Sequence, residues 1–175
     1  MTDRILGAVI AGGRSRRFGS DKALVMIAGR PMIDHVIAAL RPQVDGVIVC
    51  GRAWPGLTAI ADERPGRLGP LAGLEAALRH AVECGYAAVL SVPVDTLPLP
   101  GDLPRLLASE GPATFRKQLL IGYWPIDSLP ALSRYLDAGD RSLHGWIAVS
   151  GARAVDEPIS IFNINHEADL SALDT

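Results

Sequence analysis

The sequence of 175 residues lacks the features of several protein classes. Its two cysteines, Cys50 and Cys84, form no Cys-x-x-Cys motif, so we interpret them as reduced thiols of a cytosolic protein. Its four histidines are scattered without the spacing of metal ligands. No apolar run approaches the roughly 18 residues that span a bilayer. Asp3 and Arg4 lead directly into a short strand-like run, which is not the pattern of a signal peptide. We therefore expect a cytoplasmic protein with no membrane association.

A strong charge imbalance is also absent. The chain has 17 lysines and arginines against 19 aspartates and glutamates, which gives a net charge of -2 at pH 7. A nucleic-acid-binding protein typically carries a broad positive surface, so we expect no nucleic-acid partner. The chain is long enough for a full hydrophobic core, and we expect residues 1–175 to form a single, monomeric domain.

The most informative stretch is glycine-rich and cationic, and it reads Ile-Ala-Gly-Gly-Arg-Ser-Arg-Arg-Phe-Gly-Ser-Asp-Lys from Ile10 to Lys22. It follows the apolar run Ile5–Ile10, which is typical of a buried strand, and it carries a local excess of three positive charges. It has neither the Gly-Lys-Ser/Thr ending of a P-loop nor the spacing of a Rossmann fingerprint. Glycines let backbone N–H groups approach a ligand, so the stretch predicts a site for a phosphate-bearing molecule. The alternative is a solvated basic loop.

Strand and helix patterns alternate along the chain, most regularly in its first half. There the apolar patterns predict strands at 5–10, 46–50, 58–61 and 87–92, and helices at 31–40 and 71–82. The second half predicts strands at 113–115, 120–124 and 161–164, helices capped by Ser128 and Ser142, and a last helix at 167–173. This order indicates an α/β fold with a mostly parallel sheet and helices on both faces. We expect Trp124 and Trp146 to belong to the core.

Ligands of such sheets bind beyond the carboxyl ends of the strands. Three loops, 11–22, 62–70 and 93–100, leave those ends and should converge. In the third loop Asp95 follows a buried strand, and three neighbouring prolines stiffen the chain around it. A carboxylate held there is suited to Mg²⁺, which takes few protein oxygens and completes its shell with water and phosphates. The alternative is a turn residue that bonds to the nearby backbone.

Two further features of this edge are weaker signals. The segment Gly69–Gly73 opens the 71–82 helix, where free N–H groups attract an anion, although Gly73 is equally compatible with ordinary helix packing. Asp62, after the third strand, is suited to accept hydrogen bonds from a base or a ribose, or to be a solvated turn residue.

Four motifs in order now resemble the molybdenum cofactor guanylyltransferases, a family of nucleotidyltransferases. They are Ala-Gly-Gly-x-Ser-x-Arg, Phe-Gly-x-Asp-Lys-Ala-Leu, Gly-Pro-Leu-Ala-Gly-Leu and Val-Pro-x-Asp-x-x-x-x-Pro. The second half agrees at 122–125, 138–142 and 162–170, so that the resemblance runs from about residue 5 to residue 173. It implies a three-layer α/β/α Rossmann-like nucleotidyltransferase fold, with a nucleotide-binding N-terminal half and an acceptor-binding C-terminal half.

The resemblance also implies a reaction, in which GTP and molybdenum-loaded molybdopterin give the guanine dinucleotide cofactor and pyrophosphate with Mg²⁺. The implied catalytic residues are Arg17, Lys22 and Asp95, and Asp95 is also the implied metal ligand. The implied GTP-binding residues are Ile10, Ala11, Gly12, Gly13, Lys22, Asp62, Gly69, Gly73 and Asp95. The implied acceptor-binding residues are Arg141, Asn163 and Asn165. Transient contacts with molybdenum insertion proteins and molybdoenzyme chaperones are expected on the same ground.

Two departures from the family pattern leave alternatives open. Cys50 stands where some relatives have an asparagine that contacts the nucleotide. The segment between Leu107 and Gly122, which the resemblance implies should border the acceptor, is shorter than in relatives. One alternative is a cytidylyltransferase of the same fold, although Gly12 and Ser15 favour GTP. The other is a non-catalytic molybdenum cofactor carrier, which would have no need of Arg17, Lys22 and Asp95 together.

Overall fold

The computed structural model describes residues 3–12, 21–61, 64, 69–165 and 169. Within these residues seven strands form the central sheet, in the order β10-β8-β9-β6-β1-β4-β5. Its parallel centre consists of β1 (Ile5–Ile10), β4 (Gly46–Cys50), β5 (Thr58–Ile60) and β6 (Ala88–Pro93). The other strands are β8 (Ala113–Phe115), β9 (Gly122–Pro125) and β10 (Arg153–Val155). Only β9 among them runs against its neighbours, so the prediction of a mostly parallel sheet is confirmed.

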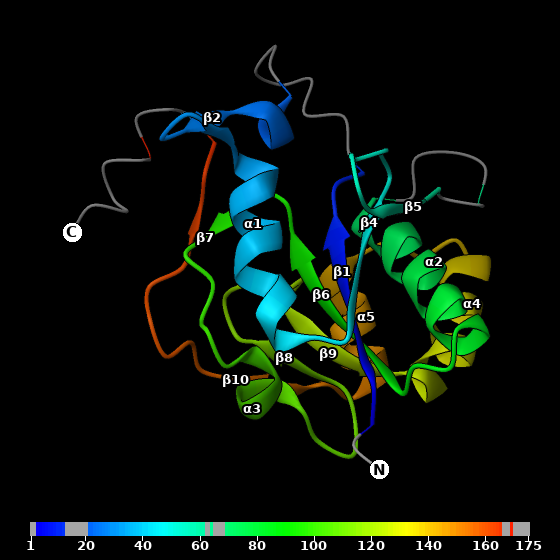
Figure 1. The fold of residues 1–175 in the computed structure, drawn as a ribbon. Helices are drawn as coiled ribbons and strands as arrows, with labels where there is room; N and C mark the ends of the chain where they lie inside the picture. Colours follow the sequence, from blue (N-terminus) through cyan, green and yellow to red (C-terminus); the bar gives the residue numbers. More distant parts are fainter. Residues whose placement is uncertain (1–2, 13–20, 62–63, 65–68, 166–168, 170–175) are drawn as a thin grey trace.

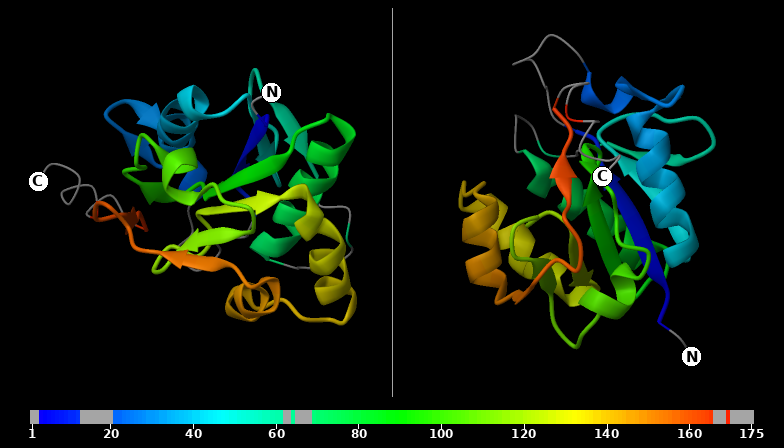
Figure 2. Two further views of the ribbon diagram at one scale, coloured as in Figure 1. Left: turned by 90° about the horizontal axis from the view of Figure 1, so that it is seen from below. Right: turned by 90° about the vertical axis from the view of Figure 1, so that its left-hand side faces the viewer.

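Helices cover both faces of this sheet, which gives the three layers that we expected (Figures 1 and 2). One face carries α1 (Met32–Leu40) and α3 (Leu103–Leu107), and the other carries α2 (Pro70–Glu83), α4 (Leu129–Asp137) and α5 (Leu143–Ser150). The alternation of β1 explains the division, because Leu6, Ala8 and Ile10 face α2 while Val9 faces α1. Each face therefore buries its own apolar core against the same strands.

The long elements of the first half match the sequence prediction closely. The strands at 5–10 and 46–50 are as expected, β5 ends one residue earlier than expected, and β6 is shifted by one residue at both ends. The helix expected at 31–40 begins at Met32, directly after Pro31, and α2 extends the expected 71–82 by one residue at each end. Long apolar patterns of this kind identify their elements because the same residues fill the core.

The second half departs more from prediction. The last strand is only β11 (Phe162–Asn163), and it pairs with β7 (Thr96–Leu97) instead of joining the main sheet. Neither β7, α3 nor β10 was predicted, and in the first half the short β2–β3 hairpin (Met26–Ile27 and Arg30–Pro31) was not predicted either. The helix expected at 167–173 lies outside the described residues, apart from residue 169.

The two predicted serine caps have different outcomes. Ser142 caps α5, since its hydroxyl accepts the Gly145 N–H at 3.1 Å. Ser128 precedes α4, but the prediction that it caps this helix is wrong, because its side chain makes no capping bond. A 3₁₀ turn at Ile126–Ser128 runs directly into α4 and already gives Ser128 a helical backbone. Short turns of this kind are common at helix starts, and they take the place of a side-chain cap.

The aromatic core is as predicted. Trp124 and Trp146 are fully buried, with ring centroids 5.9 Å apart, and the Trp124 indole N–H donates to the Ser91 hydroxyl at 2.9 Å. None of the helices in the described part of the chain is long and apolar enough to cross a bilayer.

Candidate functional site

The carboxyl ends of the parallel strands meet at one edge of the sheet, near the top in Figure 1. The Ala11 N–H donates to the Cys50 carbonyl at 2.9 Å, and the Val94 N–H donates to the Ile10 carbonyl at 3.2 Å. The chain leaving β1 is therefore held between the chains leaving β4 and β6. This confirms that the first and third predicted loops converge, for the parts of them that are described.

Lys22 and Asp95 meet at this edge, although 73 residues separate them in sequence. The Lys22 ammonium lies 3.1 Å from Asp95 Oδ2, and it also donates to Asn165 Oδ1 at 2.5 Å. The side chains of Lys22 and Asp95 are each 21% exposed, so solvent and ligands reach this ion pair. A cation and a carboxylate that remain accessible in one place are suited to a phosphate and its counter-ion.

The C-terminal strand brings both predicted asparagines to the same place. In the β7–β11 pair Asn163 lies opposite Thr96, whose hydroxyl donates to Asn163 Oδ1 at 3.4 Å. One residue further along, the Ile164 N–H donates to the Asp95 carbonyl at 2.7 Å, and the Ile164 side chain is fully buried. The core therefore anchors β11 beside Asp95. Thr96 was not singled out from the sequence, although it follows Asp95 directly.

Residues 51 and 52 hold the two described ends of the glycine-rich stretch. At one end Gly51 has a φ of +89°, and a Cβ there would lie 2.3 Å from the Gly12 Cα, so only glycine allows this close approach. At the other end the Arg52 guanidinium donates to Asp21 Oδ1 at 2.8 Å. This contact is the main cause that lowers the pKa of Asp21. Neither residue was predicted from the sequence, although both directly follow β4 at the binding edge.

Three of the predicted glycine and cysteine positions lie around the start of α2. Gly69 precedes the helix with a φ of +65°, and the space beside its Cα is open. Gly73 is buried, and a Cβ there would lie 3.4 Å from the Cys50 Cβ. Cys50 itself is 1% exposed. The structure thus supports a packing role for Gly73, and its contact with a nucleotide remains a prediction.

The remaining predicted residues are not part of the described cluster. Arg141 is exposed in the turn between α4 and α5, on the α2 side of the sheet, whereas Asn163 and Asn165 join Lys22 and Asp95. Arg17, Gly13 and Asp62 lie outside the described residues, so their roles stay predictions.

Asp95 is the residue of this edge best placed to hold a metal ion. Its Oδ2 accepts from Lys22, and its Oδ1 is 3.4 Å from the Thr96 hydroxyl. In the described ranges no group of three or more histidines, cysteines or acidic residues gathers as a metal cage. One accessible carboxylate fits Mg²⁺, which is commonly bound by one or two carboxylates together with substrate phosphates.

A second charged cluster ties the segment after β5 to the helices. Arg64 donates to both carboxylate oxygens of Glu75 on α2, at 2.5 and 2.8 Å, and to Asp137 on α4 at 2.7 Å. Glu75 is 3% exposed, and it also accepts from Arg79 and from the Ser133 hydroxyl. Chiefly through the Arg64 hydrogen bonds, these partners lower the pKa of Glu75 to about 2. No sequence signal had pointed to this cluster, because its members lie far apart in the chain.

The comparisons with known proteins agree with this architecture. The model of the family described as MobA-like NTP transferase domain matches residues 7–155. A molybdenum cofactor guanylyltransferase of Acidiphilium cryptum is 39% identical, over 94% of this chain and 91% of the relative. One of Cereibacter sphaeroides is 36% identical, over 96% and 94%. The crystal structure of molybdopterin-guanine dinucleotide biosynthesis protein A from Archaeoglobus fulgidus is similar in fold, with a TM-score of 0.74, 22% identity and 95% of each chain covered.

Proposed function

We propose, on the premise that this chain belongs to the MobA-like NTP transferase family and to its molybdenum cofactor guanylyltransferases, that it transfers GMP from GTP to molybdopterin. The acceptor phosphate of molybdenum-loaded molybdopterin attacks the α-phosphorus of GTP. A new phosphorus–oxygen bond forms, the bond from the α-phosphorus to the bridging oxygen breaks, and pyrophosphate leaves. The acceptor phosphate is already ionised at neutral pH, so the protein has no need of a general base.

The observation that carries this proposal is the meeting of Lys22, Asp95 and the two asparagines at one edge of the sheet. Phosphoryl transfer asks the protein mainly for positioning and for the neutralisation of charge. The Lys22 ammonium is free to exchange its present partners for phosphate oxygens, because its side chain is partly exposed. Arg17 adds a second positive charge for the triphosphate in this proposal.

We assign the metal to Asp95 as Mg²⁺, which would draw electron density from the phosphorus when bound. The guanosine lies against the chain that leaves β1. There the Ile10 carbonyl and the Ala11 N–H already bond within the sheet edge, so the proposed contacts use the Ala11 carbonyl and the Gly12 N–H. Asn163 and Asn165 face the acceptor in this arrangement. We further propose that the protein works in the cytoplasm.

The first test is a pyrophosphate-release assay with Mg²⁺, molybdenum-loaded molybdopterin, and GTP or CTP in separate reactions. The proposal expects release with GTP alone, together with the guanine dinucleotide product. Release with CTP alone would keep the fold and the mechanism but overturn the choice of base, which Cys50 leaves open. If neither nucleotide gives pyrophosphate release while the protein still binds the cofactor, the result would favour a non-catalytic carrier.

The metal assignment has a separate test. Removal of divalent ions with a chelator should abolish pyrophosphate release, and Mg²⁺ should restore it. Turnover that survives exhaustive chelation would contradict the role of Asp95 as a metal ligand.

A further inference from the structure

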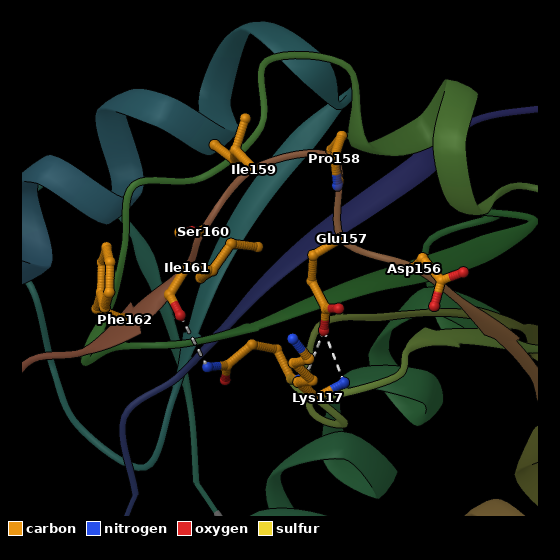
Figure 3. Close-up of a pocket in the computed structure, with 9 residues that line it drawn as sticks. Lys117, Asp156, Glu157, Pro158, Ile159, Ser160, Ile161 and Phe162 are labelled. Carbon is orange, nitrogen blue, oxygen red and sulfur yellow. Dashed lines mark hydrogen bonds between the residues drawn. The ribbon is translucent and has the colours of Figure 1, made fainter.

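A groove of about 760 Å³ lies beside the reacting edge (Figure 3). None of its lining residues was named as a binding residue from the sequence, although residues 117–118 belong to the segment that was expected to border the acceptor. We call it the strap groove, because the strap of residues 156–162 forms one wall and residues 117–118, after β8, form the other. Its walls combine polar groups with apolar side chains. Ile159 and Phe162, which are 44% and 38% exposed, belong to the apolar part.

The chain connects the strap groove to the Lys22–Asp95 site through β11. Since β9 runs against both β6 and β8, and β10 runs parallel to β8, the residues that follow β6, β8 and β10 leave the sheet at the same edge. At the end of the strap, Phe162 pairs with Leu97, and the next residue, Asn163, pairs with Thr96. A molecule with its phosphate at Asp95 therefore has the strap groove within reach along β11.

Glu157 presents a fixed carboxylate in this groove. Its Oε1 accepts the backbone N–H groups of Lys117 and Gln118 at 2.7 and 3.0 Å. Both bonds use the same oxygen, and Oε2 accepts no hydrogen bond from the residues that the structure describes. The Gln118 side chain donates to the Ile161 carbonyl at 3.4 Å, so this bond ties the two walls of the groove together.

This arrangement suits a flat heterocycle that carries neighbouring N–H donors. A carboxylate accepts charge-assisted hydrogen bonds from such N–H groups, and these are stronger than bonds between two neutral groups. Apolar side chains cover the faces of the ring. The 2-amino-4-oxopyrimidine end of a pterin has this pattern, with an amino group beside a ring N–H. We infer that the strap groove is the subsite for the pterin ring of the acceptor and that Glu157 recognises its amino edge. This inference rests on the proposed function, which supplies a pterin as the acceptor.

The variant Glu157→Gln tests the inference with little disturbance of the fold. Glutamine keeps one oxygen for the two backbone N–H groups, and it replaces Oε2 with an amino group that cannot accept. Pterin serves as the probe, and its own fluorescence reports binding. We expect the variant to bind pterin about 10- to 100-fold more weakly than the wild type. The dissociation constant of GTP should stay unchanged. Glu83→Gln, which alters an exposed carboxylate at the end of α2, should bind pterin as the wild type does.

A second variant guards against an effect on folding. Ser160→Trp adds bulk to the groove and removes no hydrogen bond that the structure describes, so it should also weaken pterin binding and leave GTP binding intact. Absence of pterin binding by the wild type, or equal binding by the wild type and both variants, would overturn the inference. If pterin binding depends on Glu157 but the protein releases no pyrophosphate from GTP or CTP, the proposed function would be overturned and the pterin subsite would still be supported.

Discussion

The Lys22–Asp95 cluster and the Arg64–Glu75 cluster both join segments that lie far apart in the chain, but they satisfy their charges to different degrees. Glu75 is almost fully enclosed and accepts from two arginines and a serine, with a pKa lowered to about 2. Asp95 and Lys22 share one direct ion pair at a partly exposed edge. A saturated buried cluster stabilises the fold, whereas an accessible one keeps capacity for a ligand.

The variant Asp95→Asn should have the largest effect, and it tests whether the accessible cluster serves turnover and not stability. We expect turnover to fall by about 100- to 1,000-fold, because the charge that balances the metal and orients Lys22 is lost. Thermal stability should change little, since asparagine still offers an oxygen to the Lys22 ammonium. Pyrophosphate release and a melting curve measure the two quantities. Asp102→Asn, at an exposed ion pair beside the start of α3, is the matched control and should keep full turnover.

The variant Glu75→Gln should show the opposite pattern. It removes the buried charged partner of Arg64, which keeps only the exposed Asp137 as a charged partner, and breaking such a buried pair costs about 3 kcal/mol of the free energy of unfolding. Urea denaturation measures this loss. The kcat of the folded variant should stay within about a few-fold of the wild-type value, because Glu75 contacts none of the reacting groups. A large drop in kcat with unchanged stability would contradict the division between the two clusters.

The pH dependence of stability tests whether the ion pairs of Glu75 stabilise the fold. The pKa of Glu75 is lowered from 4.5 to about 2 in the folded protein, so its contribution is complete above 4.5 and is lost as the pH falls through about 2. The difference in stability between the wild type and Glu75→Gln should therefore shrink between pH 4.5 and pH 2. Denaturation at several pH values checks this, and a constant difference across that range would speak against the ion pairs as the cause.

Arg52→Ala should have a smaller effect, centred on the nucleotide. Loss of the Asp21 contact releases one end of the glycine-rich stretch, while Gly51 still holds the other. A partly exposed ion pair contributes up to about 1 kcal/mol, so we expect the KM for GTP to rise by about 5-fold with kcat nearly unchanged. Steady-state kinetics at saturating acceptor measure it. Arg52→Lys should recover part of the affinity, and an equal effect on the acceptor KM would count against this role.

The smallest effect is expected at an ion pair that belongs to neither cluster. Arg105 lies on α3 and Asp102 directly precedes this helix, with side chains 79% and 41% exposed. Arg105→Ala should leave the melting temperature and turnover unchanged within error, because water screens such pairs. A clear loss of stability would show that exposure alone does not separate structural from incidental ion pairs in this protein.

The parallel half of the fold was predictable because each long element carries its own pattern. Val47, Ile48 and Val49 form an apolar run that suits only a buried strand, and the run matches β4. In contrast, β7 and β11 have two residues each and exist because they pair with one another. The apolar run 161–164 signalled a strand at β11, but β7 left no local signal, and the pairing of the two across more than 60 residues is decided only in three dimensions.

The candidate site divides in the same way. Lys22 and Asp95 stood out as charged residues after buried strands, and the structure brings them together. Arg52 and Thr96 carried no motif, and only their contacts with Asp21 and Asn163 reveal them. Gly73 was ambiguous in sequence, and its burial against Cys50 favours packing.

The long strands and helices of the parallel sheet, and the family, could be predicted from the sequence, because apolar periodicity and motif spacing are local properties of the chain. Only the tertiary structure decided which distant charges meet. It enclosed Glu75 with Arg64, left Lys22 and Asp95 accessible, and brought the strap of residues 156–162 to the reacting edge. The physical reason is that burial, and not residue type, sets how far water screens a charge and therefore whether an ion pair stabilises the fold or awaits a ligand.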